Sequence, residues 1–272
     1  MLIVDDSAYM RVVLKDMLEA DPGIHVVATA KDGLDAIDKA KKLNPDVVLL
    51  DIQMPKMDGL ATLQRIMRES PTRVVMLSAM DRVDPQLPLQ ALNLGAVDFI
   101  SKPGGPVSID IVMFGSRIVE IVRNSAEAKV DALTRARPAT PHKLHLAAPK
   151  SLKASWKKAI VMAASTGGPK TLEPVFAALP RKGNVPIFIV QHLPEGFAES
   201  FAKRLTAARG PKVVLAEDGM DAEPGTAYLA PGDKHLVLDG GRNGAVKMRL
   251  EQSDPVNYVR PSADVLFKSA AR

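Results

Sequence analysis

Cysteine is absent from the 272-residue sequence. Disulfides, cysteine nucleophiles and thiolate metal sites are therefore excluded. Aromatic residues are scarce, at 4%, whereas a nucleic-acid-binding face needs aromatic side chains interleaved with basic ones. No apolar run approaches the roughly 18 residues of a membrane span. We therefore expect neither a nucleic-acid partner nor direct insertion into a membrane.

The N-terminus also lacks the features of an export signal. It opens with MLIVDDS, without a basic leader or a cleavage-site pattern. The expected location is therefore cytoplasmic. Hydrophobic residues make up 46% of the chain and charged residues 25%, which are the proportions of a globular protein. The length suits two ordinary domains.

The net charge of +5 is concentrated in one segment of the chain. Residues 1–124 carry a net charge of −3, residues 125–157 of +5 and residues 158–272 of +3. The middle segment is rich in Ala, Pro and Lys, which is typical of a linker. Its two histidines, His142 and His145, have no acidic or thiolate companions, so we expect them to be solvated. We predict two domains, 1–124 and 158–272, joined by this linker.

Short apolar runs alternate with helix-period segments on both sides of the linker. This alternation predicts an α/β fold with two doubly wound parallel sheets. We expect the second sheet to be incomplete at its C-terminus, because the sequence stops within a predicted helix. Expected strands are 2–6, 25–30, 47–51, 73–79, 97–102, 159–165, 186–192 and 212–217, with shorter strand-like runs at 226–231, 235–239 and 245–251. Expected helices include one that follows Ser7 as its N-cap, and 33–43, 111–122, 170–179, 195–208 and 261–272.

Acidic and polar residues close the strands of the first domain. Asp5 and Asp6 follow the first strand, Asp51 ends the third, Ser78 lies near the end of the fourth and Lys102 follows the fifth. Parallel strands would gather all five at one carboxyl edge. Clustered carboxylates repel one another and need a divalent cation, and their hard oxygen atoms suit Mg²⁺. A single acid at a strand end is common, but five matching positions favour a phosphoryl-transfer site.

The segments VDDS, LLDIQMPKMDGL, MLSA and ISKP resemble the motifs of response-regulator receiver domains. The resemblance covers residues 1–124 and implies a flavodoxin-like fold. It implies transfer of a phosphoryl group from a histidine kinase to Asp51. It further implies that Mg²⁺ is bound by Asp6, Asp51 and the carbonyl of Gln53, and by Asp5 through water. Ser78 and Lys102 would contact the phosphoryl oxygens, and Phe99 would occupy the aromatic switch position.

The stretch AASTGGPKTL, residues 163–172, lies between a predicted strand and a predicted helix. It is a poor phosphate loop, because both GxxxxGK[ST] and GxGxxG are absent. It also departs from the hydrolase elbow GxSxG, since Ala163 stands at the first glycine position. Pro169 suits a first helical turn, and a serine or threonine suits the cap. Ser165 is therefore a candidate helix cap or a candidate nucleophile.

The position of His192 favours the interpretation of Ser165 as a nucleophile. This histidine closes the next predicted strand in the run QHLP, and neighbouring parallel strands would bring it to the same sheet edge as Ser165. A serine hydroxyl needs such a base to become a good nucleophile. Backbone N–H groups at the glycine-rich helix start could hold an oxyanion. From the residues alone, acyl-transfer chemistry and a simple helix cap both remain open for Ser165. His25 and His235 have no matching serine or acid nearby in the pattern and are expected to be structural.

The second half resembles the catalytic domain of chemotaxis protein-glutamate methylesterases. The resemblance rests on ASTGGP, IVQHLPEGF, YLAPGDKHL and RPSADVLF. It implies a Rossmann-like α/β serine hydrolase that acts without a cofactor. Its activities would be hydrolysis of γ-glutamyl methyl esters on methyl-accepting chemotaxis receptors, with release of methanol, and deamidation of receptor glutamines. Ser165 would be the nucleophile, and His192 the base and then the acid.

One element of the family pattern has no counterpart here. The third triad member is an Asp in a Gly- and Met-rich segment that this sequence does not contain, and Asp264 lies in a different motif. We therefore expect a truncated chain with little or no esterase activity, since loss of the acid's role costs a serine protease about 10⁴ in turnover.

The resemblance also implies regulation. The unphosphorylated receiver would obstruct the catalytic cleft until Asp51 is phosphorylated. The alternative is a receiver fused to a non-catalytic signalling or adaptor domain. A DNA-binding regulator is disfavoured, because the region 159–251 is rich in strands rather than helices.

Overall fold

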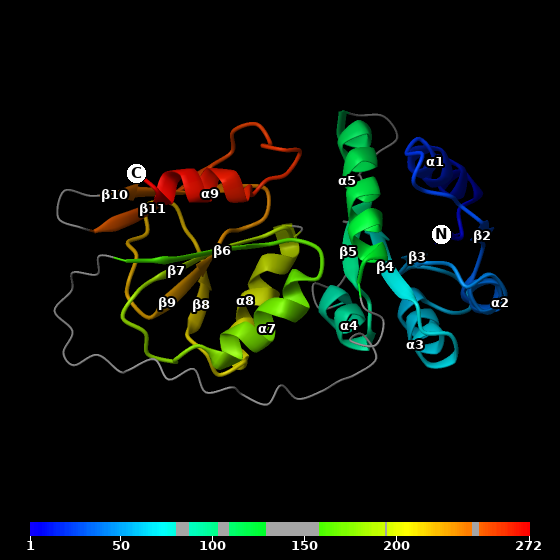
Figure 1. Ribbon diagram of the computed structural model, residues 1–272, viewed down its shortest axis with the longest axis horizontal. Coiled ribbons are helices and arrows are strands. Elements are labelled where there is room, and N and C mark those ends of the chain that lie inside the picture. Colours follow the sequence, from blue (N-terminus) through cyan, green and yellow to red (C-terminus); the bar gives the residue numbers. More distant parts are fainter. Residues whose placement is uncertain (80–86, 103–108, 129–157, 194, 241–244) are drawn as a thin grey trace. The chain divides into compact units, whose positions relative to one another are not determined.

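The computed structural model describes residues 1–79, 87–102, 109–128, 158–193, 195–240 and 245–272 (Figure 1). Most of the predicted linker, with His142 and His145, lies outside the described residues. The chain divides into two compact units, Met1–Arg137 and Pro138–Arg272. Among the helices of the described segments, none combines the length and hydropathy that a membrane-spanning helix needs.

The first unit contains a five-stranded parallel sheet, as predicted. Its strands lie in the order β2-β1-β3-β4-β5. The strand order reverses between β1 and β3, and ligand sites of doubly wound sheets form at such a switch point. Most strand residues are buried, which explains the continuous apolar runs. The strands are β1 (Leu2–Val4), β2 (Ala28–Ala30), β3 (Val47–Asp51), β4 (Arg73–Ala79) and β5 (Asp98–Lys102).

Polar caps fix where the helices of this unit begin. The Oγ of Ser7 accepts from the backbone N of Met10 at 3.3 Å, as expected of an N-cap. Asp32 and Asp58 cap the next two helices in the same way. These caps hold the loops at the carboxyl edge of the sheet. The helices are α1 (Ala8–Glu19), α2 (Gly33–Leu43), α3 (Gly59–Glu69), α4 (Leu87–Leu94) and α5 (Ile109–Ala126); α5 is longer than the predicted 111–122.

The second unit contains a four-stranded parallel sheet in the order β6-β7-β9-β8. Its strands are β6 (Ile160–Ala164), β7 (Ile187–Gln191), β8 (Lys212–Leu215) and β9 (Thr226–Leu229). The run 226–231 thus enters the parallel sheet between two strands that precede it in sequence. Figure 1 shows helices α7 (Gly168–Ala178) and α8 (Ala198–Ala207) side by side on one face, with the short 3-10 helix η2 (Glu195–Phe197) before α8.

An antiparallel hairpin and a helix cover the other face of this sheet (Figure 1). They are β10 (His235–Gly240), β11 (Val246–Glu251) and α9 (Ala263–Ala270). Phe188 and Tyr228 of the parallel sheet stack with ring centroids 5.7 Å apart, and they pack in one cluster with Met248 and Leu266. The predicted parallel fold therefore carries an additional antiparallel layer.

His235 is fully buried in this layer and has a structural role, as expected. Its Nδ1 accepts from the backbone N of Ser262 at 3.0 Å, and its Nε2 lies 3.2 Å from the carbonyl of Asp254. The imidazole thus ties the hairpin to the segment that leads into α9.

Candidate functional site

The carboxyl edge of the first sheet brings together the residues that the sequence predicted for a phosphoryl-transfer site. Asp5 follows β1, Asp51 ends β3 and Lys102 ends β5. The Nζ of Lys102 lies 2.7 Å from the Oδ2 of Asp5 and 2.9 Å from the Oδ2 of Asp51. Both acids are buried, so one ammonium group bridges two carboxylates that are largely shielded from water.

A third carboxylate completes the cluster. One ligand oxygen each from Asp5, Asp6 and Asp51 fits within a span of 4.8 Å. Asp6 is exposed, which gives a cation access from solvent. Three carboxylates against one ammonium leave an excess of negative charge, and hard carboxylate oxygens are the donors that Mg²⁺ takes. The donor set therefore fits a magnesium ion.

Burial and neighbouring charges act in opposite directions on the pKa values of Asp51 and Lys102. Burial raises the pKa of Asp51, Lys102 opposes this rise, and the nearby Asp5 adds to it. Burial alone would lower the pKa of Lys102, but its two acidic partners outweigh burial, and the pKa is raised. Lys102 therefore stays an ammonium, whereas the charged form of Asp51 is less favourable than that of an exposed carboxyl group.

The remaining predicted residues lie on strands or loops of the same edge. Ser78 pairs in register with Ser101, one step beyond the Asp51–Leu77 pair, and is buried. The backbone N–H of Gln53 bonds to Asp51. Phe99 is buried on β5, and its backbone N donates to the Oδ1 of Asp98 at 2.7 Å.

Two further residues support this edge of the sheet, and the sequence did not predict their roles. A guanidinium nitrogen of Arg11 donates to the carbonyl oxygens of Asp5 and Asp6, at 2.7 and 3.0 Å. A Cβ on Gly59 would lie 2.2 Å from the carbonyl oxygen of Asp51, so only glycine lets α3 begin so close to β3. The glycine was visible in the run MDG, but its close approach to Asp51 depends on tertiary packing.

Ser165 and His192 meet at the corresponding edge of the second sheet. The Oγ of Ser165 lies 3.0 Å from the Nδ1 of His192. The strand register explains the contact, because Ala164 pairs with Gln191 and each functional residue follows directly. For Nδ1 to accept the serine proton, the neutral ring must carry its own proton on Nε2. This geometry suits a serine nucleophile with a histidine base.

The helix-cap interpretation of Ser165 is wrong. The N-cap of α7 is Gly167, with φ +74°, and no side chain caps the helix. The turn takes a left-handed residue at the cap, which glycine tolerates, and this places Ser165 two positions before it. Pro169 lies in the first turn, as predicted. The Ser165 hydroxyl is therefore directed to His192 rather than to the helix.

Each half of the chain matches a known protein family. Residues 1–112 match the response regulator receiver domain family, and residues 160–272 match the CheB methylesterase family. The chain is 40% identical over 279 residues to the protein-glutamate methylesterase/protein-glutamine glutaminase of Thermotoga maritima, covering 99% of this chain and 76% of that protein. The Salmonella typhimurium protein of the same name is 42% identical over 276 residues, covering 100% and 75%. The chain belongs to the protein-glutamate methylesterase family.

Solved structures of single domains are also similar. The response regulator domain of Thermotoga maritima CheB is 43% identical, with a TM-score of 0.44, covering 47% of this chain and 96% of that chain. The CheB methylesterase catalytic domain from the same organism is 44% identical, with a TM-score of 0.40, covering 42% and 60%.

Asp264, which sequence analysis did not assign to the triad, lies in the first turn of α9 of the methylesterase domain. Its Oδ2 accepts from the Nζ of Lys268 at 3.3 Å, one turn along the same helix. Half of its side chain is exposed. The carboxylate is thus part of an ordinary surface ion pair, and its place in the structure gives no reason to assign it a catalytic role.

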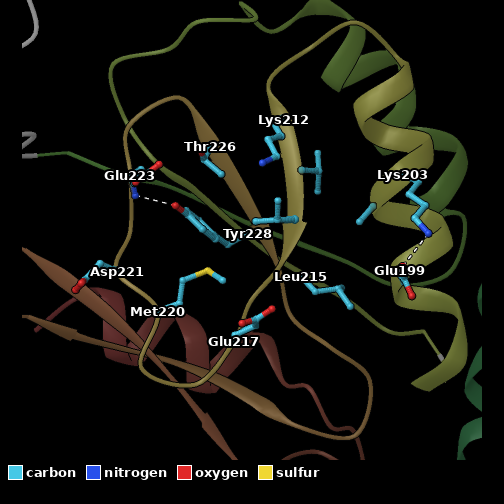
Figure 2. A pocket seen from close by; sticks show the side chains of 13 residues that line it. Glu199, Lys203, Lys212, Leu215, Glu217, Met220, Asp221, Glu223, Thr226 and Tyr228 are labelled. Atoms are coloured by element: carbon cyan, nitrogen blue, oxygen red, sulfur yellow. Dashed lines mark hydrogen bonds and ion pairs between the residues drawn. The ribbon is translucent and has the colours of Figure 1, made fainter.

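The methylesterase domain also contains a cavity of about 580 Å³ beside β8 (Figure 2). Neither Ser165 nor His192 lines it. In Figure 2 the hydroxyl of Tyr228 accepts from the backbone N of Glu223, at 2.8 Å, and Lys203 pairs with Glu199, at 2.7 Å. The cavity is therefore separate from the serine–histidine pair.

Proposed function

We propose that this protein hydrolyses glutamate methyl esters, and deamidates glutamines, on methyl-accepting chemotaxis receptors. Residues 158–272 act as the catalytic domain and residues 1–124 as a receiver that controls it through the linker 125–157. The observation that carries this proposal is the 3.0 Å contact between Ser165 Oγ and His192 Nδ1 in a chain of this family.

The contact defines the chemistry of the catalytic domain. As Ser165 Oγ attacks the γ-carbonyl carbon, His192 Nδ1 takes its proton. The positive end of the α7 dipole favours the oxyanion that forms. His192 then gives the proton to the leaving methanol or ammonia, and an acyl-serine remains. Water, deprotonated by the same imidazole, attacks the acyl-serine; His192 then returns the proton to Ser165 Oγ as the acyl–oxygen bond breaks, and the glutamate product is released.

The acidic cluster supports phosphoryl transfer from a histidine kinase to Asp51. Asp6, Asp51 and the Gln53 carbonyl would hold Mg²⁺ directly, with Asp5 acting through water. Bound Mg²⁺ supplies positive charge that stabilises the transferring phosphoryl group. The Lys102 ammonium, already beside Asp51, would move its contact to a phosphoryl oxygen.

Two further side chains complete the proposed receiver site. Ser78 would donate its hydroxyl proton to another phosphoryl oxygen. Phe99 would report the modified state as the aromatic switch. Phosphorylation then shifts the chain towards its active state.

The esterase proposal is tested by release of labelled methanol from a methylated chemoreceptor. Because this sequence offers no third triad acid, we expect a low wild-type turnover, and Ser165→Ala and His192→Ala should each abolish it, since nucleophile and base act as one unit. Ser200→Ala, a serine change on α8 of the same domain, is the matched control. Full turnover in Ser165→Ala would contradict Ser165 as the nucleophile, whereas signalling that persists unchanged in Ser165→Ala would favour the adaptor alternative.

The regulatory proposal is tested with a small-molecule phosphodonor and Mg²⁺. Phosphorylation of the wild-type chain should be lost in Asp51→Asn, together with any rise in methanol release. Asp46→Asn changes an exposed acid near the start of the same strand and should leave both unchanged. Incorporation of phosphate into Asp51→Asn at the wild-type level would contradict the assignment.

A further inference from the structure

We infer that Gln191 is a positioning residue that holds the nucleophile and the base in register through their main chains. The inference rests on the proposed serine–histidine chemistry. Gln191 is the last residue of β7 and is only 2% exposed. Its side-chain Nε2 donates to the carbonyl oxygen of Ser165 at 3.0 Å and to that of His192 at 3.4 Å. One amide group therefore binds the backbone of both reacting residues.

The chemistry of the two contacts requires a primary amide. The NH₂ group has two protons, one for each carbonyl. A carboxylate at this position would place an acceptor against two acceptors, and an aliphatic side chain would leave both carbonyls without the donor. The Ser165 carbonyl also accepts from the backbone N of Gly168 at 2.8 Å. Gln191 and Gly168 thus hold the same carbonyl from two directions.

The other end of the amide explains the second glycine of the motif. A Cβ on Gly168 would lie 1.8 Å from the Oε1 of Gln191, far inside contact distance. The turn after Ser165 is therefore shaped around the Gln191 side chain. In the described part of the chain, this Oε1 is buried and has no hydrogen-bond partner. A buried acceptor without a partner costs stability, which is the cost expected at a functional site rather than in a core.

The consequence concerns the 3.0 Å separation of Ser165 Oγ and His192 Nδ1. The two residues lie on different loops, and the backbone contact between these loops is long, at 3.4 Å from His192 N to the Ala164 carbonyl. Gln191 supplies the additional link. Without it we expect the side chains to drift by a fraction of an ångström to an ångström, and a 1 Å misplacement can cost about 10²-fold in rate.

The test compares Gln191→Met with wild type in the full chain. Methionine keeps the length of the side chain and removes both donors. We expect kcat to fall by about 10²-fold with KM within about twofold, and labelling of Ser165 by a fluorophosphonate to slow in parallel. Gln252→Met, at an exposed glutamine, is the matched control and should match wild type. A wild-type kcat for Gln191→Met, or a loss confined to KM, would overturn the inference.

Two further measurements test the inference even if Gln191→Met does not fold. In the wild-type chain, the Gln191 side-chain amide protons should exchange slowly in NMR experiments; exchange as fast as in Gln252 would refute the contacts. Gly168→Ala should lower kcat strongly in wild type and less in Gln191→Ala, where the clash with Gln191 is gone and only the 2.9 Å approach to the Ala164 Cβ remains. Equal effects in both backgrounds would count against it. Activity of Ser165→Ala would instead refute the proposed function.

Discussion

Lys102→Met removes the ammonium group that bridges Asp5 and Asp51 and keeps the length of the side chain. The Lys102 side chain is only 13% exposed. Attraction across 2.7 Å is about 6 kcal/mol at an effective dielectric constant of about 20, and desolvation offsets part of it. Removing one partner of a buried pair typically costs about 3–5 kcal/mol. We expect the free energy of unfolding of the first unit to fall by about 3 kcal/mol at pH 7 without metal, at the lower end because Asp6 admits solvent.

Two conditions should reduce this loss. Acidification protonates the uncompensated carboxylates, beginning with Asp51, whose pKa is already raised by burial; the gap between variant and wild type should therefore narrow as the pH falls towards about 4. Mg²⁺ replaces the missing positive charge, so it should stabilise the variant more than the wild type.

Hydrogen exchange of the β1 and β3 amides measures this free energy for the first unit alone. The matched control is Lys42→Met, which breaks an exposed pair with Asp38 at 2.8 Å and should cost less than about 1 kcal/mol. Equal losses in the two variants, or a gap that widens on acidification, would refute the reasoning.

Three further predictions concern backbone fit and charge. Gly59→Ala should destabilise the first unit by about 1–3 kcal/mol in chemical denaturation, because its Cβ would meet the Asp51 carbonyl, whereas Gly240→Ala has open space and should be nearly neutral. Asp51→Asn should raise the free energy of unfolding at pH 7 without metal, since burial raises the Asp51 pKa; the gain should vanish at acid pH, where the carboxyl is protonated in both states. Burial, and then the charge of Arg204, lowers the Lys170 pKa to about 8. The free energy of unfolding should therefore rise with pH between about 8 and the ordinary pKa of lysine. Lys170→Met should abolish this rise, and NMR titration should locate the pKa.

The sequence predicted most of the architecture because apolar runs and caps are local signals. The helix at 33–43 and the strands at 47–51 and 73–79 have the predicted bounds. The strand predicted at 25–30 is reduced to Ala28–Ala30. Pairing with β1 sets this limit, since β1 offers only Leu2–Val4 as partners, and a partner's length is not visible in the run itself.

The sequence also predicted which residues lie at the carboxyl edge of each sheet, but not which atoms contact one another there. Strand order placed Asp5, Asp51 and Lys102 together, and likewise Ser165 and His192. The supporting groups, Arg11, Gly59 and Gln191, could not be predicted in the same way. Their functions depend on which carbonyl each approaches in three dimensions, and no periodicity or motif encodes that approach.

The buried His235 has a consequence for how the second unit folds. It joins the hairpin β10–β11 to the start of α9, and all of these elements are neighbours in sequence; His235 itself pairs with Glu251. The parallel sheet, in contrast, must bring Ile187 to Ala227 across α8 and β8. Because short loops close at lower entropic cost than long ones, the β10–β11 hairpin should form before β7 pairs with β9. The layer that carries no reactive residue would then provide an apolar surface on which the strands leading to Ser165 and His192 assemble.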